Sequence, residues 1–443
     1  MNLSVQGNRP LIGDIADDSA ITVPGDKSLS HRAALFAALA EGESRITNFL
    51  DSGVTRAMLN ALTALGVQWS LNEGVLSVSG HGLHTFQAAQ NPLNCGNSAT
   101  TLRLLGGALA ASGVAAVLDG SEGLRKRPMG RIVQPLQQMG AAIQASEQGT
   151  APLILSERPL QQSLNAGKYR LEQASAQVKT CLLLAGLAAG GEVEIIEPAP
   201  SRDHSERMLR AMGVQVVTKD GLNVIMQPPA GSLQLLNMRL PGDFSAAAFL
   251  IVAAVLVPGS QLWLRGIGLN PGRTGLLETL MEMGADISIL NLSEQGGEPQ
   301  GDIFVCAGRL QGVKVSGDRV VQMIDEFPVF AVAAAVAEGE TQVSDAVELR
   351  FKESDRISAL AKQLVLIGIN ITENQDGFVI KGGQPIAGGL VDSQGDHRLA
   401  MSLAVAGLVS QQPVVIRRAE MINESFPQFV ELLNSIGGQL VWQ

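Results

Sequence analysis

The chain has 443 residues, of which 46% are hydrophobic and 4% are aromatic, and its formal net charge is −10 at pH 7. This composition predicts a globular protein with sizeable cores, and an acidic balance with few aromatic residues argues against nucleic acid as a partner. The longest apolar run, residues 246–257, is too short to cross a bilayer, and three cysteines without metal-ligand spacing indicate a reducing compartment, so we expect a cytoplasmic protein with no membrane segment and no metal site.

One unit recurs six times along the chain, with a period of about 70 residues. A glycine closes each copy at a position typical of the residue after a helix, and these glycines are Gly66, Gly140, Gly213, Gly284, Gly368 and Gly437. The segments before them carry apolar residues at helical spacing, which predicts amphipathic helices over 55–65, 131–139, 205–212, 275–283, 357–367 and 429–436.

Each copy also contains a second helix that is apolar on nearly every side, which indicates that it is buried. In chain order these predicted helices are 31–40, 100–111, 177–189, 245–257, 327–337 and 398–409. Strand-like runs follow them at 44–50, 115–120, 192–198, 261–267, 341–347 and 413–419. We therefore expect a helical interior with sheets and amphipathic helices outside it.

Two similar tetrapeptides, VPGD at 23–26 and LPGD at 240–243, divide the copies into three between them and three after them. We interpret them as paired crossovers between two lobes. Residues 1–24 precede the first copy and have no counterpart elsewhere, so we expect them to add a strand to the second lobe.

The starts of the buried helices collect small polar and charged residues, and the first of these helices is expected to begin at Ser28 or Ser30. Backbone N–H groups at a helix start bind anions, and nearby cations reinforce such a site. The cations at these starts, or in the loops before the amphipathic helices, include Lys27, Arg32, Arg103, Arg127, Lys179, Arg202, Lys352, Arg356 and Arg398. An acidic protein that gathers cations there is predicted to bind anions.

The segment FKESDRI places Lys352 and Arg356 four residues apart, which predicts that they share one helix face while Glu353 points about 100° away. An exposed, charged helix turn is the alternative interpretation. Asp325 and Glu326 interrupt an apolar run in IDEFPVF. Together these segments supply carboxylates beside cations, as general acid–base chemistry on an anionic substrate requires.

Two other patterns are excluded as sites. GIGLNPG at 266–272 resembles a dinucleotide-binding loop, but its glycine spacing is wrong. The five histidines form no metal-ligand motif, and His397 beside Arg398 is interpreted as a hydrogen-bonding residue at the helix start.

The motifs PGDKSLSHR, GNSATTLR, LRKRPMG, SAQVK, SRDHSE, FKESDR, GDHR and NESFP occur in this order, and the chain resembles the 5-enolpyruvylshikimate-3-phosphate (EPSP) synthase family over essentially its whole length. The resemblance implies an α/β fold, a two-lobed inside-out α/β barrel with three βαβαββ units per lobe and buried helices. The lobes would be residues 25–241 and residues 1–24 plus 242–443, with the active site in the cleft between them.

The resemblance also implies a reaction. The enolpyruvyl group of phosphoenolpyruvate would pass to the 5-hydroxyl of shikimate 3-phosphate, with release of phosphate through a tetrahedral intermediate and without a metal or organic cofactor. The implied partners are these two small molecules, and we expect a monomer that binds neither nucleic acid nor membrane. The substrate-binding residues would be Lys27, Ser28, Arg32, Asn97, Ala99, Arg127, Ser175, Ala176, Gln177, Ser201, Arg202, Asp325, Lys352, Arg356 and Arg398.

Three residues are implied to be catalytic. Asp325 is the candidate base on the 5-hydroxyl, and Glu353 is the candidate acid that protonates the methylene carbon, with Lys27 as the alternative for that proton. Two positions depart from the family pattern, because Glu348 stands where some members have Asn and Glu424 stands where several have Lys. The part played by these two residues stays open.

The motifs also bear on inhibition by glyphosate and on rival functions. SAQVK, SRDH and the Ala in GNSAT resemble the glyphosate-tolerating subgroup, although TRAMLNALTALGV resembles the other one, so we expect a glyphosate-insensitive enzyme. The related transferase acting on UDP-N-acetylglucosamine carries a Cys near the RP dipeptide, which RKRPMG lacks, and an Asn where this chain has Ser28. A non-catalytic anion-binding scaffold would need no acid–base pair.

Overall fold

The computed structural model describes residues 1–7, 9–13 and 21–443. They form two compact units. The N-terminal unit consists of Gly25–Pro241 and Glu294–Glu298, and the C-terminal unit consists of Met1–Pro24, Gly242–Ser293 and Pro299–Gln443. Within the described ranges, the helices are too short or too polar to span a membrane.

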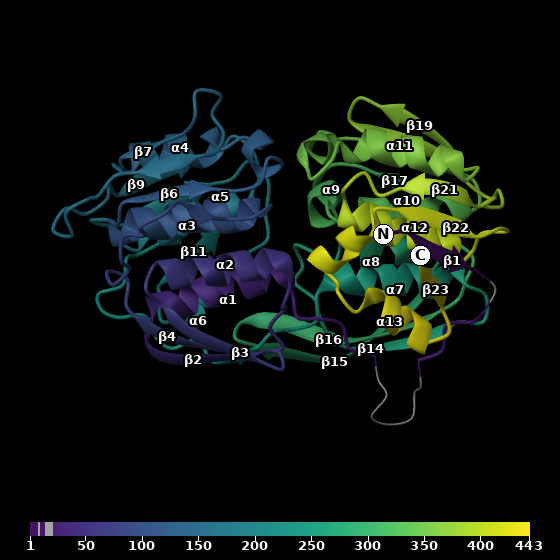
Figure 1. The fold of residues 1–443 in the computed structure, drawn as a ribbon, viewed down its shortest axis with the longest axis horizontal. Helices are drawn as coiled ribbons and strands as arrows, with labels where there is room; N and C mark the ends of the chain where they lie inside the picture. The colour runs from purple at the N-terminus through teal and green to yellow at the C-terminus, as the bar shows by residue number, and fades with distance from the viewer. Residues whose placement is uncertain (8, 14–20) are drawn as a thin grey trace. The chain divides into compact units, whose positions relative to one another are not determined.

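Each unit is built around three buried helices, which Figure 1 labels. They are α1 (Lys27–Leu39), α3 (Ala99–Ser112) and α5 (Ala176–Gly186) in the N-terminal unit, and α7 (Phe244–Leu256), α10 (Phe327–Val336) and α12 (His397–Gly407) in the C-terminal unit. All six predicted buried helices are confirmed. Small residues let them pack closely: a Cβ atom at Gly107 of α3 would lie 2.1 Å from the carbonyl oxygen of Cys181 in α5.

The six predicted amphipathic helices are also confirmed. They are α2 (Gly53–Ala64), α4 (Gly130–Gln138), α6 (His204–Ala211), α8 (Gly275–Glu282), α11 (Arg356–Leu366) and α13 (Phe429–Ser435). The glycine that follows each of them has a positive φ, between 87° and 117°, which favours glycine because it lacks a Cβ atom. The remaining helical segments are α9 (Asp318–Gln322), η1 (Leu124–Lys126), η2 (Val347–Phe351) and η3 (Ala419–Glu424).

The strands of the N-terminal unit form three sheets, with the orders β13-β2-β4-β3, β5-β6-β8-β7 and β9-β10-β12-β11. In each sheet the first pair is parallel and the other pairs are antiparallel, which is the pairing of a βαβαββ unit. These strands are β2 (Glu41–Thr47), β3 (Gln68–Asn72), β4 (Val75–His81), β5 (Leu93–Asn94), β6 (Ala116–Asp119), β7 (Ile143–Gln144), β8 (Leu153–Leu155), β9 (Gly167–Arg170), β10 (Val193–Ile196), β11 (Val216–Lys219), β12 (Asn223–Met226) and β13 (Met238–Arg239).

The other three sheets have the orders β14-β16-β15, β17-β18-β20-β19 and β21-β22-β1-β23. Their strands are β1 (Leu3–Gln6), β14 (Gln261–Gly268), β15 (Asp286–Gln295), β16 (Glu298–Cys306), β17 (Lys314–Val315), β18 (Glu340–Val343), β19 (Asn370–Asn374), β20 (Gly377–Lys381), β21 (Gly389–Asp392), β22 (Val414–Arg417) and β23 (Gln439–Trp442). In the last sheet β1 is antiparallel to both β22 and β23, between which it lies.

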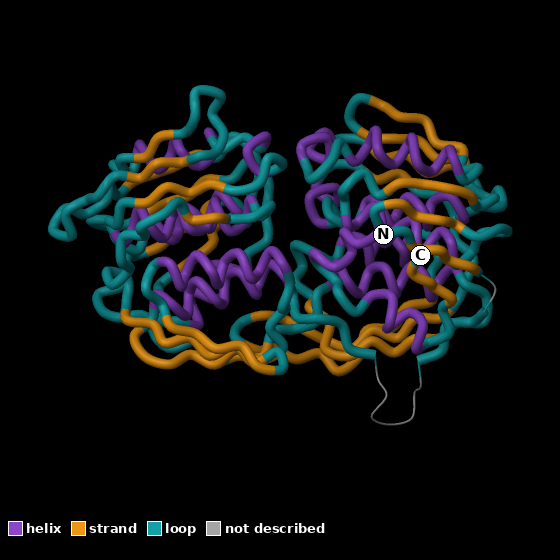
Figure 2. The backbone as a smooth tube through the Cα atoms, viewed as in Figure 1, coloured by secondary structure: helices purple, strands orange, loops and turns teal. Residues whose placement is uncertain are grey.

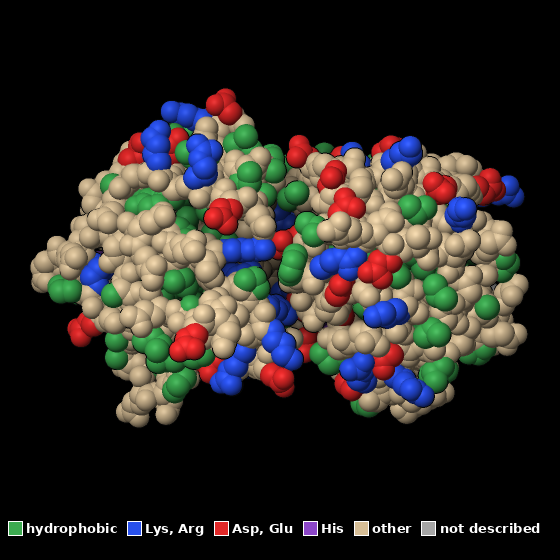
Figure 3. All heavy atoms as spheres, turned by 90° about the horizontal axis from the view of Figure 1, so that it is seen from above, with side chains coloured by type: hydrophobic (Ala, Val, Ile, Leu, Met, Phe, Trp, Pro, Cys, Tyr) green, Lys and Arg blue, Asp and Glu red, His purple; other side chains and the backbone are tan. Residues whose placement is uncertain are grey.

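The predicted α/β architecture with buried helices is confirmed. Figure 2 shows strands around the helices of each unit, and among the described residues the strands form six separate small sheets that close no barrel. On the face drawn in Figure 3, Lys and Arg side chains are interspersed with Asp and Glu side chains.

The two PGD segments mark an exchange of strands between the repeats. The segment before α7 supplies β13, which pairs in parallel with β2, whereas Ile21, before α1, bridges to Leu264 of β14. The backbone N–H of Asp26 donates to the carbonyl oxygen of Pro241 at 2.9 Å, and that of Asp243 donates to Pro24 at 2.8 Å. Each buried helix that follows a PGD segment therefore starts from a backbone held by the other segment.

Candidate active site

In the N-terminal unit, His31 links the starts of two buried helices. Its Nδ1 atom lies 2.8 Å from the carbonyl oxygen of Lys27, the first residue of α1, and its Nε2 atom lies 3.3 Å from Oγ of Ser98. Ser98 caps α3 by accepting a hydrogen bond from the backbone N–H of Thr101. Burial lowers the pKa of His31 to about 4, so this link is a neutral imidazole at neutral pH.

Arg32 connects the starts of α1 and α5 with α6. Its Nε atom donates to Ser205 Oγ at 2.8 Å, Nη2 donates to Thr180 Oγ1 at 2.9 Å, and Nη1 donates to the carbonyl oxygen of its neighbour Ser28 at 3.0 Å. Arg32 is 2% exposed, and burial lowers its pKa to about 10, so the guanidinium still carries its charge at neutral pH. Hydroxyl and carbonyl oxygens orient this charge without neutralising it.

Gln177, in the first turn of α5, is held by α3 through both ends of its amide. Arg103 Nη1 donates to Gln177 Oε1 at 2.6 Å, and Gln177 Nε2 donates to Thr100 Oγ1 at 2.9 Å. Arg103 Nη2 also donates to the carbonyl oxygen of Pro128 at 3.1 Å. Arg103 therefore couples the start of α5 to the loop that carries Arg127.

The loop after β6 fixes the orientation of Asn97. Ser121 Oγ donates to Asn97 Oδ1 at 3.0 Å, and the backbone N–H of Ser121 donates to the carbonyl oxygen of Gly96 at 2.8 Å. Because the amide oxygen of Asn97 accepts from Ser121, the amide nitrogen is the group that Asn97 can offer to an anion. Arg127 follows in the same loop and is half-buried.

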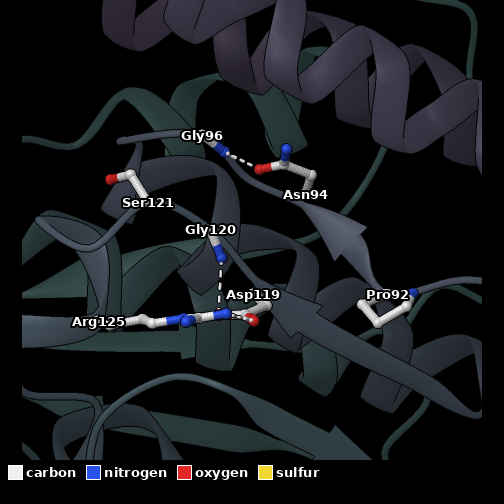
Figure 4. Close-up of a pocket in the computed structure, with 7 residues that line it drawn as sticks. All are labelled: Pro92, Asn94, Gly96, Asp119, Gly120, Ser121 and Arg125. Atoms are coloured by element: carbon white, nitrogen blue, oxygen red, sulfur yellow. Dashed lines mark hydrogen bonds and ion pairs between the residues drawn. The ribbon is translucent and has the colours of Figure 1, made fainter.

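A hollow of about 340 Å³ lies beside this loop (Figure 4). Arg125 Nη2 lies 2.5 Å from Asp119 Oδ2 in it, and the hydrogen bond from Arg125 lowers the pKa of Asp119. Its lining residues are Pro92, Asn94, Gly96, Asp119, Gly120, Ser121 and Arg125. These lining residues include none of the residues predicted to bind substrate, so we do not assign the hollow to the site.

The structure places the predicted residues of the N-terminal unit at the starts of three helices and in two loops. Lys27, Ser28 and Arg32 belong to α1, Asn97 and Ala99 to the start of α3, Ser175, Ala176 and Gln177 to the start of α5, and Arg127, Ser201 and Arg202 to the loops before α4 and α6. The contacts of His31, Arg32 and Gln177 bring the three starts together, and helix starts are electrostatically positive. The arrangement suits a multiply charged anion.

One detail of the prediction is wrong. The helix expected to begin at Ser28 or Ser30 begins at Lys27. Asp26 is its cap, because Asp26 Oδ1 accepts the backbone N–H of Leu29 at 2.8 Å. The cap places Lys27 in the first turn of the helix.

In the C-terminal unit, Arg356 gathers carboxylates from three segments. Its Nε atom donates to Asp396 Oδ2 at 2.8 Å, its Nη2 atom donates to Glu353 Oε2 at 2.7 Å, and its Nη1 atom lies 3.5 Å from Asp325 Oδ1. Burial opposes the charge on Arg356, but the attraction of Asp396, Glu353 and Asp325 is stronger and raises the pKa of Arg356. Asp396 also caps α12 by accepting the backbone N–H of Arg398 at 2.9 Å.

Arg398 holds the segment before α10. Its Nη1 atom donates to the carbonyl oxygen of Asp325 at 3.0 Å, and its guanidinium lies 3.9 Å from Asp325 Oδ2 and 3.8 Å from Glu326 Oε1. The predicted residues Asp325, Glu353, Arg356 and Arg398 are therefore brought together at the starts of α10, α11 and α12. Among the described residues, no group of three or more His, Cys, Asp or Glu is arranged to hold a metal ion.

The predicted helix face shared by Lys352 and Arg356 is wrong. Lys352 and Glu353 precede α11, which begins at Arg356, because Asp355 caps it by accepting the backbone N–H of Ser358 at 3.1 Å. Glu353 therefore turns back to Arg356 instead of pointing away. Lys352 is half-buried, and burial lowers its pKa against the attraction of Asp325.

Sequence reasoning missed the buried ion pair between Arg273, the last residue of GIGLNPGR, and Asp243. Arg273 Nη2 donates to Asp243 Oδ1 at 3.0 Å and to Ser245 Oγ at 2.7 Å, and Ser245 in turn donates to Glu326. Asp243 caps α7 as Asp396 caps α12. The signal was available in the acidic residue before each helix, which is typical of a cap, but the arginine that binds it lies in a loop excluded on other grounds.

The family model described as EPSP synthase (3-phosphoshikimate 1-carboxyvinyltransferase) matches residues 16–433. A protein of Syntrophomonas wolfei named 3-phosphoshikimate 1-carboxyvinyltransferase is 45% identical over 429 residues, which cover 97% of this chain and 98% of that protein. A protein of Salinibacter ruber with the same name is 46% identical over 419 residues, which cover 94% of this chain and 96% of that protein. The structure of EPSP synthase from Acinetobacter baumannii matches with a TM-score of 0.87 and 42% identity, over 100% of both chains. The resemblance carried by the motifs is confirmed, and the chain belongs to the EPSP synthase family.

Proposed function

We propose that this enzyme transfers the enolpyruvyl group of phosphoenolpyruvate to the 5-hydroxyl of shikimate 3-phosphate and releases phosphate. The observation that carries the proposal is the cluster of Asp325, Glu353, Arg356 and Arg398 at the helix starts of the C-terminal unit. It supplies two carboxylates for proton transfer beside cations that can bind an anionic substrate. The N-terminal unit, with its three linked helix starts, supplies the complementary receptor for phosphate.

The shikimate 3-phosphate side is assigned to the N-terminal unit. A phosphate group carries about −1.5 to −2 charges at neutral pH, and helix starts with basic side chains suit such a group. In this assignment Ser175, Ala176, Gln177, Ser201 and Arg202 surround the phosphate, and Ser28 and Arg32 hold the ring and carboxylate. Ala176 can contribute only its backbone N–H, because its side chain has no polar atom.

The phosphoenolpyruvate side is assigned to residues of both units. Asn97, Ala99 and Arg127 come from the N-terminal unit, and Arg356 and Arg398 come from the C-terminal unit. Lys27 would contact both substrates, and Gln177 and Lys352 would lie between them. The proposal therefore makes the two units two lobes that serve one reaction.

The reaction follows from proton transfers at two atoms. Asp325 takes the proton of the 5-hydroxyl, and Glu353 or Lys27 delivers a proton to the methylene carbon of phosphoenolpyruvate. The adjacent carbon becomes electrophilic, and the 5-oxygen bonds to it to form a tetrahedral intermediate. The group that delivered the proton, Glu353 or Lys27, then takes a proton from the new methyl group, the carbon–oxygen bond to phosphate breaks, and the double bond is restored as phosphate departs. Arg356 Nη2 donates to Glu353 Oε2, and this contact orients the carboxyl group of Glu353.

The proposal extends to three properties of the enzyme. We place it in the cytoplasm as a monomer that needs no metal or organic cofactor. We also propose that glyphosate inhibits it poorly, because Ala99, the first residue of α3, carries a methyl group beside the predicted phosphoenolpyruvate site.

The test is an assay of phosphate release with mass analysis of the product. We expect release only when shikimate 3-phosphate and phosphoenolpyruvate are both present, with a product that contains both carbon skeletons. Release from phosphoenolpyruvate with UDP-N-acetylglucosamine in place of shikimate 3-phosphate would favour the rival transferase. Binding of both anions without turnover would favour a non-catalytic scaffold.

A further inference from the structure

A second charged cluster lies beneath the loop that carries Ser201 and Arg202. Lys179 Nζ lies 2.7 Å from Glu197 Oε2 and 2.7 Å from Glu206 Oε1, and the three side chains are only 1–2% exposed. Lys179 belongs to α5, Glu197 follows β10, and Glu206 belongs to α6. None of the three is among the residues to which a substrate contact or a proton transfer is assigned above.

The cluster holds the loop through two hydrogen bonds to Ser201. Lys179 Nζ donates to the carbonyl oxygen of Ser201 at 3.2 Å, and Ser201 Oγ donates to Glu197 Oε1 at 2.5 Å. A hydroxyl group has one hydrogen to donate, and Glu197 accepts it. Ser201 is therefore held at its backbone and its side chain, and its peptide N–H is the donor that it can still offer to a ligand.

Stability alone does not account for this arrangement. Removing a charge from water costs several kcal/mol, and a buried ion pair often contributes no more to stability than apolar residues of similar volume. A loop that is already ordered, in contrast, avoids the entropic cost of being fixed when a ligand binds. The two contacts on Ser201 lie next to Arg202, a predicted ligand of the phosphate, so an ordered loop there would lower the entropic cost of binding the phosphate.

We propose that Lys179 and Glu197 are positioning residues that hold the 201–202 loop ready to bind the phosphate of shikimate 3-phosphate. The proposal deepens the proposed function and depends on it. Glu206 serves as the internal comparison, because it pairs with the same Lys179 but makes no contact with Ser201 among the described residues. The cluster thus contains one carboxylate that reaches the loop and one that does not.

Two matched variants separate positioning from general effects of charge. Glu197→Gln and Glu206→Gln each replace one buried carboxyl group beside Lys179, and only the first alters a group that contacts Ser201. Glu206→Gln keeps a side-chain oxygen beside Lys179 and changes neither Lys179 nor Glu197, the two residues that bind Ser201. Glu197→Gln leaves one acceptor oxygen for two donors, so Lys179 and Ser201 can no longer both donate to the side chain at this position, and neither meets a charged acceptor there.

We expect Glu197→Gln to weaken binding of shikimate 3-phosphate about tenfold, the loss typical of one hydrogen bond to a charged group. The weakening should appear in calorimetric titration with shikimate 3-phosphate alone and as a raised KM for that substrate. The kcat and the KM for phosphoenolpyruvate should stay within about twofold, and Glu206→Gln should weaken binding of shikimate 3-phosphate less than Glu197→Gln does. Melting temperatures measured in parallel report any purely structural effect.

Equal weakening by Glu197→Gln and Glu206→Gln, or a fall in kcat with both KM values raised, would overturn the proposal while leaving the proposed function intact. A wild-type protein that binds shikimate 3-phosphate but does not turn over would refute the proposed function, and the calorimetric comparison would still decide whether the loop is positioned. Should Glu197→Gln fail to fold, Ser201→Ala decides. That variant removes only the hydroxyl contact, and unchanged affinity for shikimate 3-phosphate would overturn the proposal.

Discussion

The two units repeat one architecture but surround the arginines at their helix starts with different partners. In the N-terminal unit, Arg32 and Arg103 donate to hydroxyl, amide and carbonyl oxygens. In the C-terminal unit, Arg273 and Arg356 donate to carboxylates. Neutral oxygens orient a guanidinium, whereas carboxylates also share its charge and are themselves held in place by it. One repeated frame thus holds arginines with neutral oxygens in one unit and with a set of carboxylates in the other.

The largest effect is expected when the carboxylate set is broken at Glu353. Glu353→Gln keeps an oxygen that can accept from Arg356, so the variant should fold, but it cannot deliver the proton. We expect kcat to fall about 10²–10⁴-fold, the usual contribution of a general acid or base. Steady-state phosphate release gives the measurement. Glu373→Gln, which alters an exposed partner of Arg350, is the control and should leave kcat unchanged. Near-normal turnover of Glu353→Gln would assign the proton to Lys27.

The next effect tests steric selection at a helix start of the N-terminal unit. Glyphosate is longer than phosphoenolpyruvate, so the methyl group of Ala99, a residue 4% exposed, should collide with it. Overpacking by one methyl costs about 1–3 kcal/mol, or roughly ten- to two-hundredfold in affinity. Ala99→Gly should tighten glyphosate inhibition by that factor while the KM for phosphoenolpyruvate changes little. Inhibition curves against phosphoenolpyruvate decide, and tight inhibition of the unmodified enzyme would disprove the idea.

A smaller effect follows from His31, the neutral link between α1 and α3 in the N-terminal unit. The pKa of His31 is lowered to about 4 in the folded protein, against 6.5 for an ordinary histidine. Between these values the unfolded chain binds a proton that the folded protein does not, so stability is lost as the pH falls from about 6.5 to about 4. His31→Asn removes this dependence. The difference in free energy of unfolding between the variant and the wild type should therefore change by ~1 kcal/mol per pH unit in this window.

Urea unfolding at a series of pH values in this window measures that difference. The control is His84→Asn, which alters an exposed histidine and should keep the wild-type slope. The same slope in His31→Asn and the wild type would mean that the imidazole is protonated in the folded protein.

The last prediction is that removal of metal ions leaves the activity unchanged. Because arginines already occupy the carboxylates of Asp396, Glu353 and Asp243, we expect the activity to be unchanged after dialysis against EDTA. Loss of phosphate release with EDTA, restored by a divalent cation, would show that the carboxylate set serves a metal and not a proton.

The sequence predicted the elements well and their contacts poorly, mainly because elements depend on local patterns and contacts do not. Helix periodicity and a closing glycine are local properties, so the buried and amphipathic helices could be read from short windows. The link from Arg32 to Ser205 joins residues 173 positions apart, and that from Arg356 to Asp396 joins residues 40 positions apart. Such pairs depend on how helices pack. The error at Lys352 arose locally, since a capping residue outweighed charge spacing.

The place of β1 between β22 and β23 has a consequence for biosynthesis. Leu3 pairs with Ile416 and with Trp442, so β1 is synthesised long before the two strands with which it pairs. The residues of the N-terminal unit, in contrast, have all been synthesised once Glu298 has been added. Domains generally fold as units during synthesis, so the N-terminal unit should be complete first. Leu3 and Val5, which are fully buried in the finished protein, would meanwhile remain exposed and be a natural target for chaperones on the nascent chain.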